Sequence, residues 1–285
     1  MTTAAQYFRA VCGRMSSAFG SQAEGEAAAR IVFEDVAGYD RKYLFMNGER
    51  EITDFMQAKI DAVVKRVEGG EPVQYAVGTA RFMGLDFAVT PAVLVPRPET
   101  AWLVDAITDR YGHQRDLSVL DAGTGSGCIA IALARALPFC RVTAVDISEA
   151  ALEVARTNAE ALGADVNFCR ADILTAQPER EGEYDIVVSN PPYICESERA
   201  EMESRVADHE PALALFVPDS DPLEFYRAIA RFAVVALKPG GRVYFEINSR
   251  FPEEMRALLE AEGYSDIEII RDYKGLYRYA VAVKS

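Results

Sequence analysis

Hydrophobic side chains recur every three or four residues from the start of the chain to Gly69, which is the spacing of helices with one buried face. Gly69 and Gly70 are followed by Pro72, and this combination ends the last predicted helix. The pattern predicts a small helical domain over residues 1–72. Its recurring apolar positions are Phe8, Val11, Met15, Phe19, Ile31, Val32, Val36, Ile52, Phe55, Met56, Ile60, Val63, Val64 and Val67.

The spacing of apolar residues changes after this helical region. Phe82, Leu85 and Phe87 are placed around Gly84 at the alternating spacing of a β-hairpin. We therefore expect a β-hairpin linker over residues 73–96. An extended path after the hairpin is predicted from three prolines, which are Pro91, Pro96 and Pro98.

Short apolar runs alternate with amphipathic helical segments from Leu117 onward. This alternation is typical of a doubly wound, mostly parallel sheet that is covered by helices on both faces. The last two strands follow one another without a helix, which predicts an antiparallel edge. We expect an α/β, Rossmann-like domain over residues 97–285. The predicted strands are 117–123, 141–146, 166–172, 184–190, 241–247, 265–271 and 276–284, and the predicted helices are 127–137, 148–162, 222–237 and 252–262.

Composition narrows the class of protein. The 285 residues carry a formal net charge of −14, which argues against a long nucleic acid as the main partner, because phosphates require clustered Lys and Arg. The chain has only two histidines, which are too few to favour a histidine-based metal site or a histidine-dependent catalytic triad. No metal is expected. The five scattered cysteines form no CxxC pair, as in a reducing compartment. Without a recognisable signal peptide or membrane-spanning run, the expectation is a soluble, cytoplasmic protein.

A glycine-rich loop follows the first predicted strand of the α/β region. In the stretch GTGSG, Gly123, Gly125 and Gly127 allow a tight turn and a close approach of the backbone to a ligand, and the next helix offers free N–H groups. Asp146 ends the following strand, where its carboxylate can accept hydrogen bonds from a ribose diol. The sequence therefore predicts a nucleoside site that also includes the intervening Thr124 and Ser126.

The details of this loop favour S-adenosylmethionine over a dinucleotide. The glycine spacing is GxGxG rather than GxGxxG, and Asp121 lies in the turn, where a carboxylate would repel a pyrophosphate but suit an ammonium and a sulfonium. Asp172 and Ile173 end the third strand. There the acid can meet the adenine amino group, and the aliphatic side chain can pack on the ring.

The fourth strand ends in the sequence NPPY, residues 190–193. It is expected to face the same crevice as the glycine-rich loop. Methyl transfer to an amide or exocyclic amino nitrogen needs acceptors for the N–H groups, so that the lone pair points at the methyl group. The side-chain oxygen of Asn190 and the carbonyl of Pro191 can be these acceptors, and Pro192 stiffens the turn. Tyr193 offers a flat face for a planar amide or base.

These motifs together resemble the release factor glutamine methyltransferases. NPPY is shared with adenine-N6 DNA methyltransferases, but the upstream string GLDFAVTPAVLVPRPET is much more specific, and the resemblance spans nearly the whole chain. It implies methylation of the glutamine side-chain amide in the GGQ motif of peptide chain release factors, by a protein that is a monomer. It also implies that 123–127, Asp146 and Ile173 hold the cofactor, that Asn190 contacts both cofactor and glutamine, and that the helical domain helps to dock the release factor.

Two departures and two rival functions remain. The family usually carries a glycine-rich segment where this chain has 217–226, and a glycine where it has Asn248, which puts fine substrate contacts in question. Glu246 could orient a site group, although a strand-end acid is more often solvated. An adenine-N6 DNA methyltransferase would want a basic channel for a flipped base. A non-catalytic binding module would not need both the glycine loop and NPPY intact.

Overall fold

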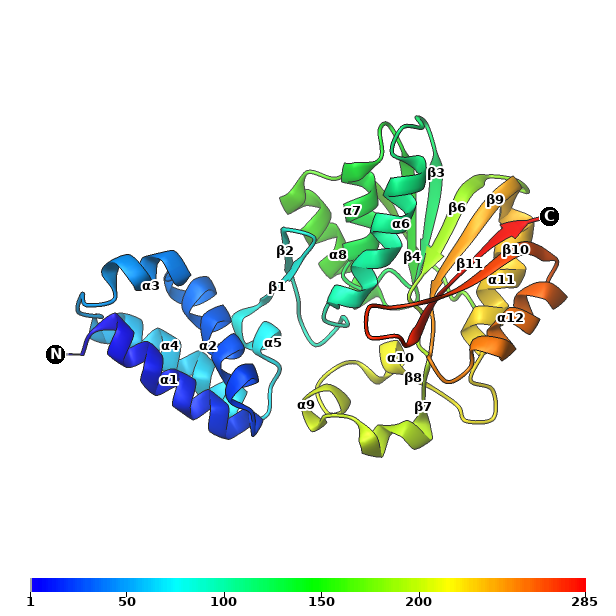
Figure 1. Cartoon of the computed structure of the whole chain (residues 1–285). Helices are drawn as coiled ribbons and strands as arrows, with labels where there is room; N and C mark the ends of the chain where they lie inside the picture. The colour runs from blue at the N-terminus through cyan, green and yellow to red at the C-terminus, as the bar shows by residue number, and fades with distance from the viewer. Residues whose placement is uncertain (1) are drawn as a thin grey trace. The chain divides into compact units, whose positions relative to one another are not determined.

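The computed structural model describes residues 2–285, and its internal contacts divide the chain into two compact units. The smaller unit contains the chain up to Thr79 together with Glu203–His209, and the larger contains Ala80–Met202 and Glu210–Ser285. In Figure 1 the helices of the N-terminal region are blue and cyan. The large sheet belongs to the larger unit. No helix among residues 2–285 combines the length and the apolar character that a membrane span requires.

The smaller unit is helical, as the apolar spacing predicts. Oxygen atoms of Thr3, Ser21, Asp40 and Thr53 each accept a backbone N–H at the start of a helix, so polar residues between the apolar runs fix where the helices begin. Its elements are α1 (Ala4–Phe19), α2 (Gln22–Ala37), α3 (Arg41–Asn47), α4 (Asp54–Glu68) and α5 (Val73–Val77). Since Val73 and Ala76 of α5 are part of the same core, the residues just after Pro72 are helical rather than part of the hairpin.

A short segment from late in the chain also belongs to the smaller unit. It contains α9 (Ser204–Ala207), and Arg205 anchors it. The Arg205 guanidinium donates to the carbonyls of Val67, Glu71 and Ala18 at 2.7, 3.3 and 2.9 Å, and lies 4.0 Å from the ring centre of Phe19. The carbonyls and the ring together replace the water that this charge loses.

The predicted hairpin is formed by β1 (Thr79–Phe82) and β2 (Leu85–Ala88). Met83 and Gly84 connect the strands with φ of 49° and 76°. Positive φ at both turn residues matches the right-handed twist of paired strands, which explains glycine at the second position. Phe82 and Phe87 are buried in the core of the larger unit.

The larger unit is built on a seven-stranded sheet in the order β10-β11-β9-β6-β3-β4-β5. Neighbouring strands from β9 to β5 are parallel, whereas β10 and β11 are antiparallel, so the predicted fold class and antiparallel edge are confirmed. The strands are β3 (Ser118–Ala122), β4 (Arg141–Asp146), β5 (Val166–Arg170), β6 (Tyr184–Ser189), β9 (Leu237–Glu246), β10 (Tyr264–Arg271) and β11 (Tyr277–Lys284).

Helices lie on both faces of this sheet (Figure 1), and an apolar core fills the space on each face. One core joins the sheet to α6 (Ala101–Tyr111), α7 (Cys128–Ala136) and α8 (Glu149–Leu162), and the other joins it to α11 (Glu224–Ala236) and α12 (Pro252–Ala261). Central strands such as β3 are therefore buried throughout, and they carry apolar residues at successive positions rather than at alternate ones.

The chain between β6 and α11 contains short elements that hydrophobic periodicity did not predict. β7 (Ile194–Cys195) pairs in parallel with β8 (Phe216–Val217), and the 3-10 helix η2 (Glu196–Glu201) and α10 (Ala212–Leu215) lie between them in sequence. Another 3-10 helix, η1 (Pro98–Thr100), precedes α6. Elements of two to six residues are too short to show a period, so this miss has a simple cause.

Candidate active site

A cavity of the larger unit lies at the carboxyl ends of β3, β4, β5 and β6, where ligands bind in open α/β sheets. Most of the residues that the sequence nominates for the site line this one cavity. They are Gly123, Thr124, Gly125, Ser126, Asp146, Asp172, Ile173, Asn190, Pro191 and Pro192. The structure therefore brings the glycine loop and the first three residues of NPPY together, whereas Gly127 and Tyr193 are not among the lining residues.

The three loop glycines have different roles, although all have positive φ. A Cβ atom added to Gly123 or Gly125 would meet no atom within 4 Å, so the backbone at these two positions is open to a ligand. A Cβ on Gly127 would lie 3.0 Å from Ile131 Cδ1 and 3.2 Å from Ala155 Cβ. Gly127 is thus needed for the close packing of α7 and α8 rather than for direct access to the cavity.

Asp146 links the glycine loop to the start of α8. Its Oδ2 atom accepts the backbone N–H of Gly125 at 2.9 Å, and its Oδ1 atom accepts that of Ser148 at 2.9 Å. A carboxylate offers about four lone-pair sites, so each oxygen keeps capacity for a hydroxyl donor from a ligand. The side chain lines the cavity and is fixed before a ligand binds.

Asp121 does not lie where the sequence interpretation put it, beside the ligand. The residue is fully buried and is not a lining residue. Its Oδ2 atom accepts the Thr124 hydroxyl at 2.7 Å and the Ala130 N–H at 3.2 Å, which holds the loop against α7. Burial raises the pKa of this carboxyl to about 7. Its Oδ1 atom has no hydrogen-bond partner within the described residues.

Asp172 and Ile173 follow β5 and both line the cavity. The Asp172 Oδ1 atom accepts the N–H of Leu174 at 3.0 Å, which shapes a turn after the strand. The charged residues that line the cavity are Asp146, Asp172 and Arg97. Arg97 forms an ion pair with the buried Glu210. Two acidic side chains beside open glycines and apolar walls fit a nucleoside that carries positive charge. This lining suits S-adenosylmethionine.

Asn190 follows directly after β6, at the edge of the cavity. Its Nδ2 atom donates to Thr100 Oγ1 at 3.2 Å, and its Oδ1 atom has no partner within residues 2–285. The Thr100 hydroxyl donates its one proton to Glu246, so its oxygen accepts from Asn190, and the amide end that it contacts is the NH₂ end. Asn190 therefore presents an acceptor that the protein leaves unused.

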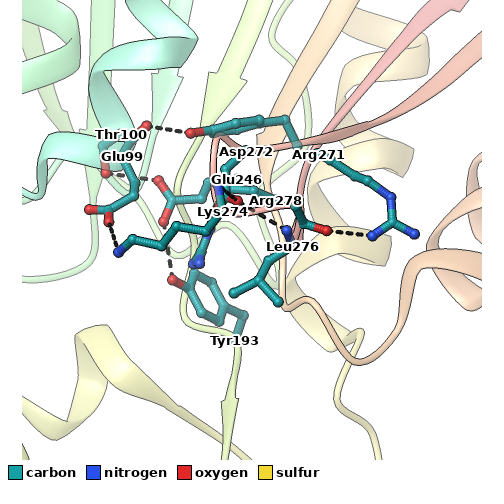
Figure 2. A network of polar contacts seen from close by, with 11 residues as sticks. Glu99, Thr100, Tyr193, Glu246, Arg271, Asp272, Lys274, Leu276 and Arg278 are labelled. Atoms are coloured by element: carbon teal, nitrogen blue, oxygen red, sulfur yellow. Dashed lines mark hydrogen bonds and ion pairs between the residues drawn. The ribbon is translucent and has the colours of Figure 1, made fainter.

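Tyr193 is oriented by a buried acid. Its hydroxyl donates to Glu246 Oε1 at 3.1 Å, and Figure 2 shows the phenol directed toward this carboxylate. Stacking of the ring on a substrate stays a prediction. Asn248, the departure from the family pattern, donates its side-chain amide to the Tyr193 carbonyl at 2.9 Å and to Glu198 at 3.1 Å, so it fixes the end of NPPY.

Sequence reasoning missed the part that Thr100 and Glu246 play. Both are buried, with 3% and 2% of their surface exposed, so Glu246 is not the solvated acid that its place at a strand end suggested. The Thr100 hydroxyl donates to Glu246 Oε2 at 2.8 Å. The end of VPRPET carries Thr100, but the sequence held no signal that it meets β9. Within residues 2–285, no group of three or more His, Cys, Asp or Glu side chains is arranged to hold a metal ion.

Comparison of the sequence with known proteins shows which family the chain belongs to. A family model described as PrmC N-terminal domain matches residues 13–78, and one described as Methyltransferase small domain matches residues 98–208. A Bacteroides thetaiotaomicron protein named release factor glutamine methyltransferase is 45% identical over 91% of this chain and 92% of its own length. The chain belongs to the release factor glutamine methyltransferase family. A second member, from Koribacter versatilis, is 40% identical over 86% of each chain.

Solved structures agree with the fold of this family member. A T. thermophilus 16S rRNA methyltransferase, in complex with AdoMet and guanosine, superposes with a TM-score of 0.53 at 22% identity. The match covers 73% of this chain and 50% of that one. At this level of identity the similarity shows the methyltransferase fold alone.

Proposed function

We propose that this release factor glutamine methyltransferase family member transfers a methyl group to the side-chain amide nitrogen of the glutamine in the GGQ motif of peptide chain release factors. The curated relatives carry the name of this activity. The proposal is carried by one observation, which is that the free Asn190 acceptor and the open glycine loop line the same cavity.

S-adenosylmethionine would supply the methyl group, which its positively charged sulfonium sulfur carries. Gly123 and Gly125 would admit it close to the backbone, Asp146 would accept hydrogen bonds from its ribose, and Asp172 with Ile173 would hold its adenine. Thr124 and Ser126 complete the loop, while Gly127 supports it from behind.

The chain's own residues would orient the glutamine. Asn190 Oδ1 and the Pro191 carbonyl would each accept one N–H of the glutamine amide, which directs the nitrogen lone pair toward the cofactor side of the cavity. Pro191 is buried and Pro192 half-buried, so a stiff turn carries both acceptors. The nitrogen becomes acidic as its new bond to carbon forms. A proton leaves from it afterwards, and a strong general base is not required.

The remaining properties belong to the same proposal. Release factor is the protein substrate, and the helical unit contributes to its docking. We also propose that the enzyme acts as a monomer in the cytoplasm, without nucleic acid as its substrate. The segment 217–226 is held by contacts of its own, because Asp219 accepts the Ser197 hydroxyl and Asp221 pairs with Arg227, so its loop differs from a glycine-rich one.

The test is direct. The protein is incubated with labelled S-adenosylmethionine in separate reactions that contain a release factor, the same factor with its GGQ glutamine changed to alanine, or duplex DNA. The proposal predicts label on the first substrate alone, and a mass gain of one CH₂ group that mass spectrometry assigns to the glutamine side chain. Label on DNA alone would establish an adenine methyltransferase instead, and label on the altered factor would mean a different acceptor residue.

A further inference from the structure

A buried chain of hydrogen bonds continues from the NPPY motif into the protein. Asn190 Nδ2 donates to Thr100 Oγ1 at 3.2 Å, Thr100 Oγ1 donates to Glu246 Oε2 at 2.8 Å, and Tyr193 donates to Glu246 Oε1 at 3.1 Å. Figure 2 shows Thr100 and Tyr193 meeting the two oxygens of the same carboxylate. The links join residues that are 90, 146 and 53 positions apart.

We propose that Thr100 and Glu246 are positioning residues, which hold the Asn190 carboxamide with its Oδ1 atom available to the substrate. This inference rests on the function proposed above, since Oδ1 is there the acceptor for the glutamine N–H. Glu246 does not line the cavity, and it reaches the motif through Thr100 and Tyr193. Thr100 does line the cavity, but its hydroxyl is already engaged by Glu246 and Asn190, so it acts on the substrate through Asn190.

The direction of each hydrogen bond follows from the charge on Glu246. An ionised carboxylate can only accept, so both hydroxyls must donate to it. The Thr100 oxygen then has only lone pairs left for a further partner. Asn190 must offer its NH₂ group to that oxygen, and its carbonyl end is left free. A single charge therefore decides which end of the carboxamide is available to the substrate.

Burial makes the ionised form of Glu246 less favourable than it is in water, but groups around the carboxylate stabilise its negative charge. Burial raises the pKa of its carboxyl, and nearby Glu99 acts in the same direction. The hydroxyls of Thr100 and Tyr193 and the positive charge of Arg278 oppose this. Arg278 also pairs with Asp272 at 3.1 Å, and Lys274 pairs with Glu99 at 3.3 Å (Figure 2).

Protonation or neutralisation of Glu246 would undo the arrangement. In the variant Glu246→Gln, the neutral side chain could donate its NH₂ to Thr100, whose hydroxyl would then turn and donate to Asn190. Asn190 would have to flip to accept, and its NH₂ would replace the oxygen at the free end. A donor would then face the glutamine N–H groups, where an acceptor is required.

Steady-state kinetics of matched variants test this relay. Thr100→Val keeps the shape of the side chain but removes the hydroxyl, whereas Thr100→Ser keeps the hydroxyl. Thr108→Val is the control, since Thr108 lies in α6 and donates only to backbone carbonyls of its own helix, at Val104 and Asp105. We expect kcat to fall by about 10- to 100-fold for Thr100→Val, and to stay within about threefold for the other two.

Glu246→Gln provides the second arm. We expect a comparable loss of kcat in this variant, while the cofactor dissociation constant stays within about twofold of wild type, because the cofactor residues are unchanged. A purely structural role predicts instead that melting temperature falls and that cofactor affinity and kcat fall together. Unchanged kcat in Thr100→Val and Glu246→Gln, or equal losses in Thr100→Val and Thr100→Ser, would overturn the proposal.

A readout without substrate separates this inference from the proposed function. In protein labelled with ¹⁵N-asparagine, the Asn190 side-chain NH₂ signal is identified by its disappearance in Asn190→Asp. The relay predicts that the hydrogen donated to Thr100 exchanges slowly with solvent in wild type and fast in Thr100→Val, with Thr108→Val unchanged. Fast exchange in wild type would refute the relay. Slow exchange in a protein that fails to methylate release factor would refute the proposed function and leave the relay standing.

Discussion

Substitution of single loop glycines by alanine separates ligand access from packing. Gly125→Ala and Gly127→Ala add the same methyl group to neighbouring positions of one loop, with φ of 55° and 81°. Their surroundings differ, because the space at Gly125 is open and borders the cavity, whereas Ile131 and Ala155 crowd Gly127. The two variants should therefore fail in different ways.

The expected magnitudes follow from these contacts. Alanine at Gly125 should lower the free energy of unfolding by about 1 kcal/mol, because a residue with a Cβ atom is strained in the left-handed backbone conformation. The cost stays this small because φ at Gly125 is near the ideal value for that conformation. At Gly127 the contacts at 3.0 and 3.2 Å add overpacking, for a total of about 2–4 kcal/mol. The Gly125 methyl instead occupies ligand space, and we expect cofactor affinity to fall about 10-fold or more, which is about 1.4 kcal/mol.

Urea unfolding and equilibrium titration with S-adenosylmethionine measure the two effects separately. Gly163→Ala is the matched control, because Gly163 has φ of 63°, open space around it and a position at the end of α8 away from the cavity. It should lose about 1 kcal/mol of stability and keep full cofactor affinity. Wild-type affinity in Gly125→Ala, or a Gly127→Ala variant as stable as Gly163→Ala, would refute the assignment of roles.

Four further substitutions or conditions probe the rest of the site. Asp146→Ala should weaken cofactor binding by about 1–3 kcal/mol through lost hydrogen bonds to a charged acceptor, and unchanged affinity in a titration would contradict this. Asn190→Ala should abolish methyl transfer while cofactor affinity falls much less, so full turnover would disprove the amide clamp. Arg205→Ala should destabilise the helical unit by about 2–4 kcal/mol and speed proteolysis near residue 205, as it removes three hydrogen bonds and a cation–π contact. Because the Glu246 pKa is raised and the relay needs the ionised form, kcat should fall as pH drops through a pKa above the usual glutamate range, and Glu246→Gln should lack this acid limb.

The fold and most of the cavity lining were predictable because their signals are local. Apolar runs indicated the central strands, and the lack of a helix between the last two strands indicated the antiparallel edge. The glycine loop and Asn190 end adjacent strands, and the carboxyl ends of parallel strands meet at one edge of a sheet. Motif position alone therefore brought the loop and Asn190 together.

What the sequence could not predict depends on contacts between distant segments. Thr100 and Glu246 are 146 residues apart, and they meet only because α6, which begins directly after Thr100, packs against β9. Asp121 read as a ligand neighbour because its place in the turn is visible in the sequence, while the direction of its side chain is not. In the same way, one spacing pattern covered Gly125 and Gly127, although only the first is open to the cavity.

Segment 203–209 shows the same limit at larger scale. Its sequence is polar and without a clear period, so it read as part of the region after NPPY. In the structure the segment belongs to the helical unit, where Arg205 donates to the carbonyls of Val67 and Ala18. A charge that is satisfied by backbone carbonyls leaves no complementary residue in the sequence to reveal its partners.

The central claim is that cofactor and substrate amide meet in one cavity, between the glycine loop and NPPY. A crystal structure of the protein with S-adenosylhomocysteine and a glutamine-containing release factor fragment tests it most directly. The account predicts the ribose at Asp146 and the glutamine NH₂ within hydrogen-bond distance of Asn190 Oδ1 and the Pro191 carbonyl. A cofactor bound elsewhere, or a glutamine that contacts Asn190 Nδ2 instead, would contradict it.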